Sequence, residues 1–371
     1  MLEVLDSARL TQARHALGLT KRELADRLHV SPAAIGQYEA GTIKPRLEQL
    51  ARLAQELRVP VGFFAGGRPR AGLDVSMAHF RSLRATRRFE REQALTFVEQ
   101  AWELAYALSK YVRLPQLDLP GWDEDAGEDP HLVDSPSHSG SDPIAAALLL
   151  RKRWDLGDKP VSHVVRTLES RGIIVVILDP TGSGRVDAFS TSRTPRPVVV
   201  LTRHKDDVYR HRFNAAHELG HLILHADALP GDVQHEREAN AFAAEFLSPR
   251  HRLITQLPRR LDLGTLLQIQ GEWGVSIESL LYRSQELGVL PEASHRRGRI
   301  RLHQLRASGV VATASISRFS GEQPVMLSKA FDLAAGHGLT MKQLSNQIAL
   351  PALRIRELLG ASNLRPELRL V

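Results

Sequence analysis

Apolar residues recur at helical spacing over residues 5–64, with three short interruptions, and this pattern predicts four or five short helices. The spacing is helical again from Phe80 to Val112. This second stretch begins with many arginines and ends as an amphipathic pattern, so we interpret it as a solvated helix that connects two domains.

The apolar pattern stops at residues 114–143, which contain eight aspartates and glutamates but no lysine or arginine. Such a composition, with several prolines, glycines and serines, predicts an acidic, flexible linker. Runs rich in β-branched residues at 172–179, 186–190 and 197–201 then predict a small sheet, followed by more helices. The expected fold class is multidomain: an all-α N-terminal domain, an α+β domain with a small sheet, and a mainly helical C-terminal region.

Residues 211–225, "HRFNAAHELGHLILH", have the pattern of a buried helix but contain two histidines four positions apart and a glutamate beside the first. On a helix, His217 and His221 fall about 40° apart, and Glu218 lies about 60° to 100° from them. The alternative to a metal site is a pair of hydrogen-bonded core histidines. An apolar core rarely accepts two imidazoles and a carboxylate without a partner, so the spacing favours two metal ligands and a neighbouring base.

A zinc site for hydrolysis needs a third protein ligand and one open position. His225 lies about 12 Å along the helix axis from His217, too far for both to reach one ion, so we expect it to support the site or the packing. Glu236 is the better candidate. It belongs to a helical stretch, residues 236–249, whose alanines would let the two helices approach closely.

Other polar residues of this second helix have different expected roles. Asn240, one turn after Glu236, is expected to orient a ligand through a hydrogen bond. Glu238 and Glu245 point about 160° to 180° away from Glu236, and we interpret them as a solvated acidic face.

The chain contains no cysteine, so any metal must be held by His, Asp or Glu, and disulfides are excluded. Zinc lowers the pKa of a bound water molecule towards about 7, and we expect Glu218 to take its proton for attack on a carbonyl polarised by the same ion. One Zn²⁺ per chain is therefore the expected cofactor.

The segments "RFNAAHELGHLILH" and "EREANAFAAEFLSP", with "VDAFS" and "RPVVVL" upstream, resemble the ImmA/IrrE family of zinc metalloproteases, which cleave helix-turn-helix repressors. The resemblance covers roughly residues 144–290. It implies a zincin-like domain in which His217, His221 and Glu236 bind zinc and Glu218 is the catalytic acid/base.

Residues 14–45, "RHALGLTKRELADRLHVSPAAIGQYEAGTIKP", resemble the Xre helix-turn-helix family of phage repressors, over about residues 5–64. The resemblance implies that the second helix of the motif enters the major groove of double-stranded DNA. It also implies an ion pair between Arg14 and Glu39. The DNA-contacting positions that it implies are Lys21, Ser31, Ala33, Gln37 and Lys44.

The N-terminal motif offers few side chains that could form hydrogen bonds with DNA bases. Pro32, Ala33 and Gly36 offer no side-chain hydrogen bonds, so direct readout would depend on Gln37 and on methyl contacts. The alternative for this module is a small helical protein-interaction domain.

Residues 18–35 align without gaps on residues 338–355, with matching Gly, Leu, Thr, Leu and Ile positions. This similarity predicts a second helix-turn-helix-like unit at the C-terminus.

The formal net charge of +7 favours anionic partners such as nucleic acid. The N-terminus lacks an export pattern, and the longest apolar run, at 144–150, is too short to span a bilayer. We therefore expect a cytoplasmic protein without a membrane partner. By analogy with phage repressors, we expect a homodimer.

Five segments are expected in chain order: a helix-turn-helix domain at 1–66, a helical connector at 67–113, the acidic linker at 114–143, the metallopeptidase domain at 144–290 and a helical C-terminal region at 291–371. The functional hypothesis is a DNA-binding transcriptional regulator fused to a zinc endopeptidase that cleaves a repressor-type protein in a stress or phage-related response. The alternative is a transcription factor whose zinc domain senses a ligand or partner without cleaving. A third hypothesis has the helix-turn-helix module blocking the protease groove in cis.

Overall fold

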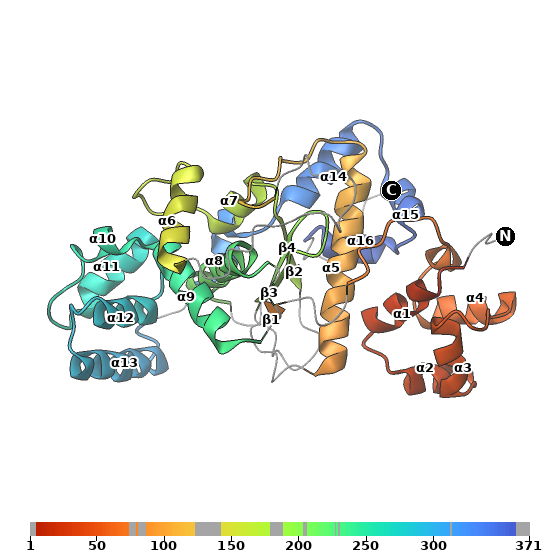
Figure 1. Ribbon diagram of the computed structural model, residues 1–371, viewed down its shortest axis with the longest axis horizontal. Coiled ribbons are helices and arrows are strands. Elements are labelled where there is room, and N and C mark those ends of the chain that lie inside the picture. The colour runs from red at the N-terminus through yellow and green to blue at the C-terminus, as the bar shows by residue number, and fades with distance from the viewer. Residues whose placement is uncertain are drawn as a thin grey trace, which may run out of the picture.

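The computed structural model describes residues 5–73, 79–80, 87–122, 142–178, 188–202, 206–226, 228, 231–311 and 314–360, with only the backbone described at 79–80. A small sheet forms the middle layer, and helices cover both of its faces (Figure 1). The N-terminal helices form a separate group beside the long helix α5 (Arg88–Ser109). Within the described residues, no helix is long and apolar enough to cross a membrane.

The sheet has four strands in the order β1-β3-β4-β2. These are β1 (His79–Phe80), β2 (Ile174–Leu178), β3 (Ala188–Thr191) and β4 (Val198–Thr202). Strand β2 pairs with β4 in parallel, whereas β3 is antiparallel to both β4 and β1. The small sheet predicted from three β-branched runs is thus confirmed, although 179, 186 and 187 lie outside the described residues. The helix expected to begin at Phe80 is wrong there, because pairing with β3 makes this residue part of a strand.

Alternating side chains of the sheet enter two separate apolar cores. Val198 and Val200 of β4 belong to the core that contains α5, and Val199 and Leu201 belong to the core on the other face. The second core contains α8 (Val208–Leu224) and α9 (Val233–Leu247), the two helices that carry the predicted metal ligands. The other helices on this side of the molecule are α6 (Pro143–Arg153), α7 (Val164–Ser170), α10 (Arg250–Leu253), α11 (Leu263–Trp273), α12 (Ile277–Glu286) and α13 (Glu292–Ala307).

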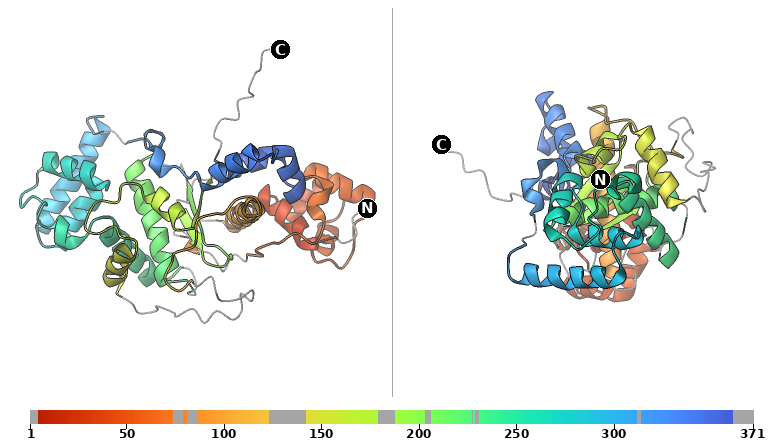
Figure 2. Two further views of the ribbon diagram at one scale, coloured as in Figure 1. Left: turned by 90° about the horizontal axis from the view of Figure 1, so that it is seen from above. Right: turned by 90° about the vertical axis from the view of Figure 1, so that its left-hand side faces the viewer.

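Helix α5 is not the solvated connector that its sequence predicts. Every residue from Ala94 to Ala105 is buried. Figure 2 shows α5 end-on, between the N-terminal helices and the sheet, with the C-terminal helices above it. Its buried polar side chains bind partners from both helical groups: Glu99 with Gln12, Glu103 with Arg9, and Gln100 with Arg354. These distant partners satisfy the polar positions that made the helix resemble a surface element.

The N-terminal group consists of α1 (Ser7–Ala16), α2 (Lys21–Leu28), α3 (Pro32–Glu39), α4 (Leu47–Glu56) and the short 3₁₀ helix η1 (Val61–Phe64). Thr20 caps α2, accepting a 3.2 Å hydrogen bond from the Glu23 amide while the Glu23 carboxylate accepts from the Thr20 amide. Ser31 caps α3 by accepting from the Ala34 amide at 3.1 Å. The expected succession of short helices is present.

The C-terminal group consists of α14 (Met326–Gly336), α15 (Met341–Ile348) and α16 (Ala352–Leu358). Helix α15 occupies the positions that align with α2, and both begin with a threonine that forms a capping box. Both also end in a left-handed residue that is not glycine, His29 at φ 54° and Ala349 at φ 52°. Helices α2 and α15 therefore begin and end at aligned positions, and they have the same kind of cap at each end.

The predicted flexible linker is wrong for its first part. Leu119 is buried, and the Trp154 indole donates to the Asp118 carbonyl at 3.0 Å. Arg153 Nε lies 2.6 Å from a carboxylate oxygen of Asp118. Residues 115–119 thus pack against the end of α6 rather than spanning solvent, because Leu117 and Leu119 are buried in the core that contains α8 and α9. Residues 123–141 lie outside the described residues.

Two buried carboxylates attach the C-terminal group to the sheet region. Glu169 of α7 accepts hydrogen bonds of 2.8 Å from the Val325 and Met326 amides at the start of α14. Glu322, in the 3₁₀ helix η4 (Ser320–Glu322), accepts from the Val164 and Val165 amides at the start of α7. Each carboxylate therefore satisfies amides that the first turn of a helix leaves without a partner.

Burial raises the pKa of the Glu169 carboxyl from 4.5 to about 7, although the Met326 and Val325 amides oppose the shift. The folded chain then holds this proton more tightly than the unfolded chain, so the free energy of unfolding falls as pH rises from about 4.5 to about 7. We expect the Glu169→Gln variant to lose this part of the pH dependence. Denaturant titrations across that range would measure it, with Glu48→Gln, an exposed carboxylate of α4, as control; parallel curves for wild type and Glu169→Gln would contradict the prediction.

Candidate metal centre

Helices α8 and α9 approach each other closely at a glycine. A Cβ atom added at Gly220 would lie 3.1 Å from the Phe242 ring and 3.3 Å from the Ala239 Cα. A side chain at this position would require the neighbouring atoms of α9 to move by a few tenths of an ångström. The close approach brings Glu236 of α9 to the face of α8 that carries the histidines.

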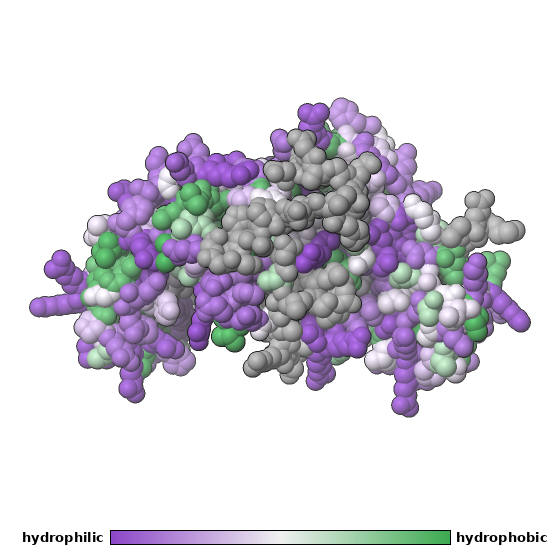
Figure 3. Space-filling model, in the orientation of Figure 1, coloured by the Kyte–Doolittle hydropathy of each residue, from purple (hydrophilic) through white to green (hydrophobic). Residues whose placement is uncertain are grey.

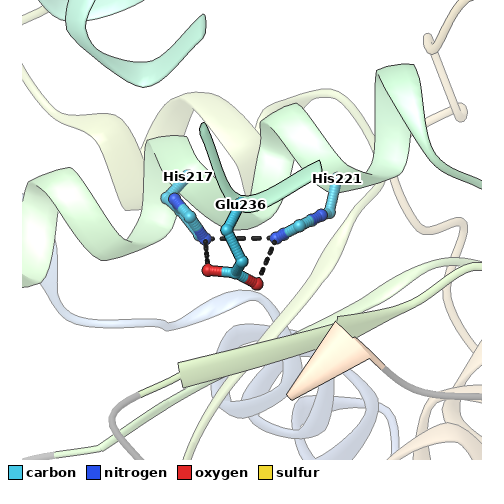
Figure 4. A group of neighbouring side chains, drawn as sticks. All are labelled: His217, His221 and Glu236. Carbon is cyan, nitrogen blue, oxygen red and sulfur yellow. Dashed lines mark hydrogen bonds and ion pairs between the residues drawn. The ribbon is translucent and has the colours of Figure 1, made fainter. Parts of the chain in front are cut away.

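The side chains of His217, His221 and Glu236 converge on one point (Figure 4). Their candidate ligand atoms all lie within 4.8 Å of one another. The two Nε2 atoms are 3.1 Å apart, and the Glu236 carboxylate oxygens lie 3.5 Å from His217 Nε2 and 3.4 Å from His221 Nε2. Both imidazoles are buried, whereas the Glu236 side chain is 27% exposed.

This donor set fits a metal ion. Two imidazole nitrogens and a carboxylate oxygen are ligands that zinc accepts, and three protein ligands leave a position for water or substrate. Within the described residues, these three form the group of His, Asp and Glu side chains that could hold a metal ion. The Glu236 carboxylate comes from α9 and lies close to both imidazoles of α8, so all three side chains could bind the same ion.

A hydrogen bond to Asn240 orients the first histidine. His217 Nδ1 lies 3.1 Å from the Asn240 side-chain oxygen, so Nδ1 carries the proton and donates it. The lone pair of a neutral imidazole is then on Nε2, which faces Glu236. Asn240 thus occupies the supporting position that the sequence analysis gave it.

A chain of hydrogen bonds orients the second histidine. His225 Nε2 lies 2.8 Å from a Glu238 carboxylate oxygen, which can only accept, so this nitrogen donates. His225 Nδ1 then accepts from His221 Nδ1, 3.1 Å away, and the lone pair of His221 is left on Nε2. Carboxylate, imidazole and imidazole therefore fix the tautomer that presents Nε2 to the site.

The local environment favours neutral imidazoles and an ionised carboxylate. Burial lowers the pKa of both His221 and His225 to about 4, against the opposing effect of Glu236 and Glu238. Burial would raise the pKa of Glu236, but the closeness of His217 and His221 outweighs it and holds the pKa well below its usual range. At neutral pH the site has the charge state that a metal requires.

The candidate base lies beside the ligands and contacts the sheet. Glu218 is fully buried, and Ser190 of β3 donates a 2.8 Å hydrogen bond to its Oε2 atom. In the register of the sheet, Ser190 lies opposite His79 of β1. Strand β3 thus contacts Glu218 of α8 through Ser190 and also pairs with β1, which comes from a distant part of the chain.

Two glutamates of α9 do not form the solvated face that their helical positions predict. Glu238 binds His225, because His225 follows the last residue of α8 in a non-helical conformation and its side chain leaves the helical register. Glu245 is fully buried and pairs with Arg283 at 2.8 Å. Sequence reasoning missed both contacts, and also His235, whose ring centroid lies 4.4 Å from that of His225.

The predicted DNA-contacting residues are accessible on the surface of the N-terminal group. Ser31, Ala33, Gln37 and Lys44 are exposed, and Lys21 is half-exposed with Nζ 3.5 Å from a Glu39 oxygen. The structural ion pair is also present, with Arg14 Nε 2.6 Å from Glu39 Oε1.

The N-terminal group does not block the metal centre. Its helix α1 packs against α5, which lies between this group and helices α8 and α9 (Figure 1). The cis-blocking arrangement of the third hypothesis is therefore not the one adopted here.

The chain matches two family models. Residues 169–285 match the IrrE N-terminal-like domain, a peptidase-family model, and residues 10–64 match the helix-turn-helix model. No curated protein matches the chain. The fold and the site thus define a DNA-binding domain joined to a domain of a metallopeptidase family. More particularly, the two matches support a helix-turn-helix domain similar to the Xre type joined to a domain similar to the ImmA/IrrE type, the architecture that the sequence predicts.

Removing the Asn240 hydrogen bond should weaken metal binding. In Asn240→Ala, His217 loses the acceptor that fixes its tautomer, and we expect the metal affinity to fall about 10- to 100-fold. Competition with a chromophoric chelator would measure the affinity. Asn346→Ala, at an exposed position of α15, should bind as the wild type does; equal affinities for all three proteins would exclude this role.

The Glu238 contact should matter in the same way. In Glu238→Gln the side chain is no longer anionic and can rotate its amide group towards His225, which loosens the orientation of His221. We expect at least about a 10-fold loss of metal affinity in the same competition assay. Glu272→Gln, an exposed position of α11, is the matched control, and a loss of similar size there would show a general charge effect instead.

Proposed function

We propose that this protein is a zinc-dependent endopeptidase and a DNA-binding transcriptional regulator in one chain. The arrangement of His217, His221 and Glu236 carries the enzymatic half of the proposal, because hydrogen bonds orient the Nε2 atoms of both imidazoles towards a carboxylate from another helix. The match of residues 10–64 to the helix-turn-helix model supports the other half.

The residues around the site have separate roles in the proposed reaction. Zinc held by the three ligands would supply a Lewis acid that polarises a peptide carbonyl and makes water more acidic. Glu218 takes a proton from the attacking water and delivers it to the leaving amine. Ser190 holds the Glu218 carboxylate in place through its 2.8 Å hydrogen bond. The buried surroundings of Glu218 exclude bulk water and strengthen its electrostatic interactions.

The proposed substrate is a repressor-type protein of the helix-turn-helix class, cleaved in a stress or phage-related response. This follows from the resemblance to ImmA/IrrE proteases. A DNA-binding domain on the same chain would bring the peptidase to sites where such repressors are bound and raise their effective concentration. We place the protein in the cytoplasm, where it has access to DNA, and propose that it binds DNA as a homodimer.

A second candidate function is a sensor that binds zinc but does not cleave. One observation favours it. The backbone of His79–Phe80 pairs with β3 at the edge where an extended peptide would otherwise add as a strand, beside the serine that holds Glu218. In this case a ligand or partner that displaces β1 would be the signal.

Metal content is the first test of the proposal. Protein purified without added metal should contain about one zinc per chain by mass spectrometry, and His217→Ala should lose it whereas His337→Ala, at an exposed position of α14's C-terminal end, should retain it. Absence of metal from the wild type would contradict both candidate functions.

Cleavage then separates the two candidates. The zinc-loaded wild type should cleave a helix-turn-helix repressor, and Glu218→Gln should retain zinc but lose at least about 100-fold in rate, since proton transfer contributes about that much. Zinc binding with no cleavage by the wild type would favour the sensor. Cleavage at an unchanged rate by Glu218→Gln would remove Glu218 from the mechanism.

A further inference from the structure

Helix α13 is the most basic element in the described part of the chain. Its 16 residues, "EASHRRGRIRLHQLRA", include five arginines and one glutamate, and Gly298 and Leu302 are its buried positions. A Cβ atom at Gly298 would lie 2.8 Å from Leu281 and 3.0 Å from Leu261, so α13 packs closely on α12 and on the loop that precedes α11 at this glycine. The close contact fixes which face of α13 points outward.

Four exposed arginines lie on that outward face and on its two flanks. Arg296, Arg297, Arg299 and Arg301 are all exposed. Among the described residues, none of these four forms an ion pair with a carboxylate, whereas Arg306, two turns beyond Arg299 on the same flank of the helix, is paired with Glu278. A cluster of positive charges without carboxylate partners repels itself, and an anionic ligand would relieve that repulsion.

The positions of these arginines form two rows along the helix. On a helical projection, Arg296 and Arg299 lie on one side of the exposed Ile300, and Arg297 and Arg301 lie on the other, with about 150° between the two rows. From the first to the last arginine the helix rises about 7.5 Å. A DNA duplex carries about four phosphates over that length, so the charge densities of the two surfaces match.

The neighbouring loop extends the same surface. Arg259 and Arg260 are exposed and directly precede Leu261, which contacts α13 at Gly298. The outward face has one large apolar side chain, Ile300, at 52% exposure, rather than the apolar stripe that a membrane-surface helix needs. Figure 3 shows mostly hydrophilic residues over the described part of this face, with smaller apolar areas near α6 and α11. The surface therefore fits a polyanion better than a lipid bilayer.

We propose that α13 is a second nucleic-acid contact, which binds the phosphate backbone of double-stranded DNA without reading its sequence. Guanidinium groups suit phosphate because they can donate two parallel hydrogen bonds to it. Double-stranded DNA is the partner that we propose for the helix-turn-helix domain of the same chain. Helix α13 lies at the opposite end of the molecule from that domain, so the two contacts engage separate stretches of DNA (Figures 1 and 2).

The second contact strengthens binding through avidity. Once the helix-turn-helix domain is bound, contact by α13 becomes an intramolecular event, and its modest affinity adds to that of the specific site. It also places DNA along the side of the molecule that includes the metal centre. This inference does not depend on cleavage, because it concerns a surface that is separate from the three metal ligands.

The salt dependence of DNA binding tests the proposal. The full-length protein is titrated with a fluorescent duplex of random sequence, long enough to reach both ends of the molecule, at about 50 and about 200 mM salt. Each phosphate contact contributes about 0.9 to the slope of log affinity against log salt, so replacing the four arginines by glutamine should lower the slope by about 3.6. The loss of affinity between the two salt concentrations should then be about a hundredfold smaller in the variant than in the wild type.

The control variant loses the same charge elsewhere. It replaces four exposed cations outside α13 by glutamine, namely Lys152, Lys159, Arg318 and Lys342. We expect its salt slope to match that of the wild type. A variant with four lysines in place of the α13 arginines should also keep the slope, because phosphate contacts depend mainly on charge. Circular dichroism and zinc content show whether each variant is folded.

Three results would overturn the proposal. An unchanged slope in the glutamine variant would show that α13 does not contact DNA. An equal decrease in the control variant would show a general effect of net charge. Unchanged DNA binding together with loss of binding to single-stranded RNA or anionic vesicles would assign the surface to another partner.

Discussion

The burial of α5 is the constraint on which the arrangement of this protein depends. Among the described helices, α5 is the longest that covers this face of the sheet, and leaving its Val, Ile and Phe side chains uncovered would be costly in water. The same helix presents Glu99, Gln100 and Glu103 to the helical groups at the two ends of the chain. Three parts of the molecule thus share one buried helix. The sheet, held from this side, supports on its other face the helix that carries the histidines.

The metal centre illustrates how burial and hydrogen bonding combine to prepare a ligand set. Burial alone would make the imidazoles neutral but would leave their tautomers undefined. Asn240 and the pair of His225 and Glu238 remove that freedom, so both lone pairs face Glu236. The orientation is therefore built into the protein side of the site, and the helix contact at Gly220 brings the two halves of the ligand set together.

Much of the site follows from the sequence because short-range geometry determines it. The positions of His217 and His221 on one helix face need only the helical repeat, and the caps at Thr20 and Thr340 need only local hydrogen bonds. The sequence misled us where partners come from far along the chain. The pattern of α5 predicts a solvated helix, but its polar residues are buried because they bind Arg9, Gln12 and Arg354. The helical position of Glu245 predicts a solvated side chain, but it is buried in an ion pair with Arg283. A helical projection gives the direction of a side chain but not what lies in that direction.

The extent of the core around α5 also has a consequence for synthesis. This single core includes residues from Leu10 near the beginning of the chain to Leu359 near its end. On the ribosome, α5 and the strands emerge well before α14, α15 and α16, so part of their apolar surface stays without its cover until those helices have been translated. Contacts over such sequence distances close slowly. The nascent chain therefore has an extended period in which chaperones can bind it, and a ribosome that stalls before α14 would release a product with an open core.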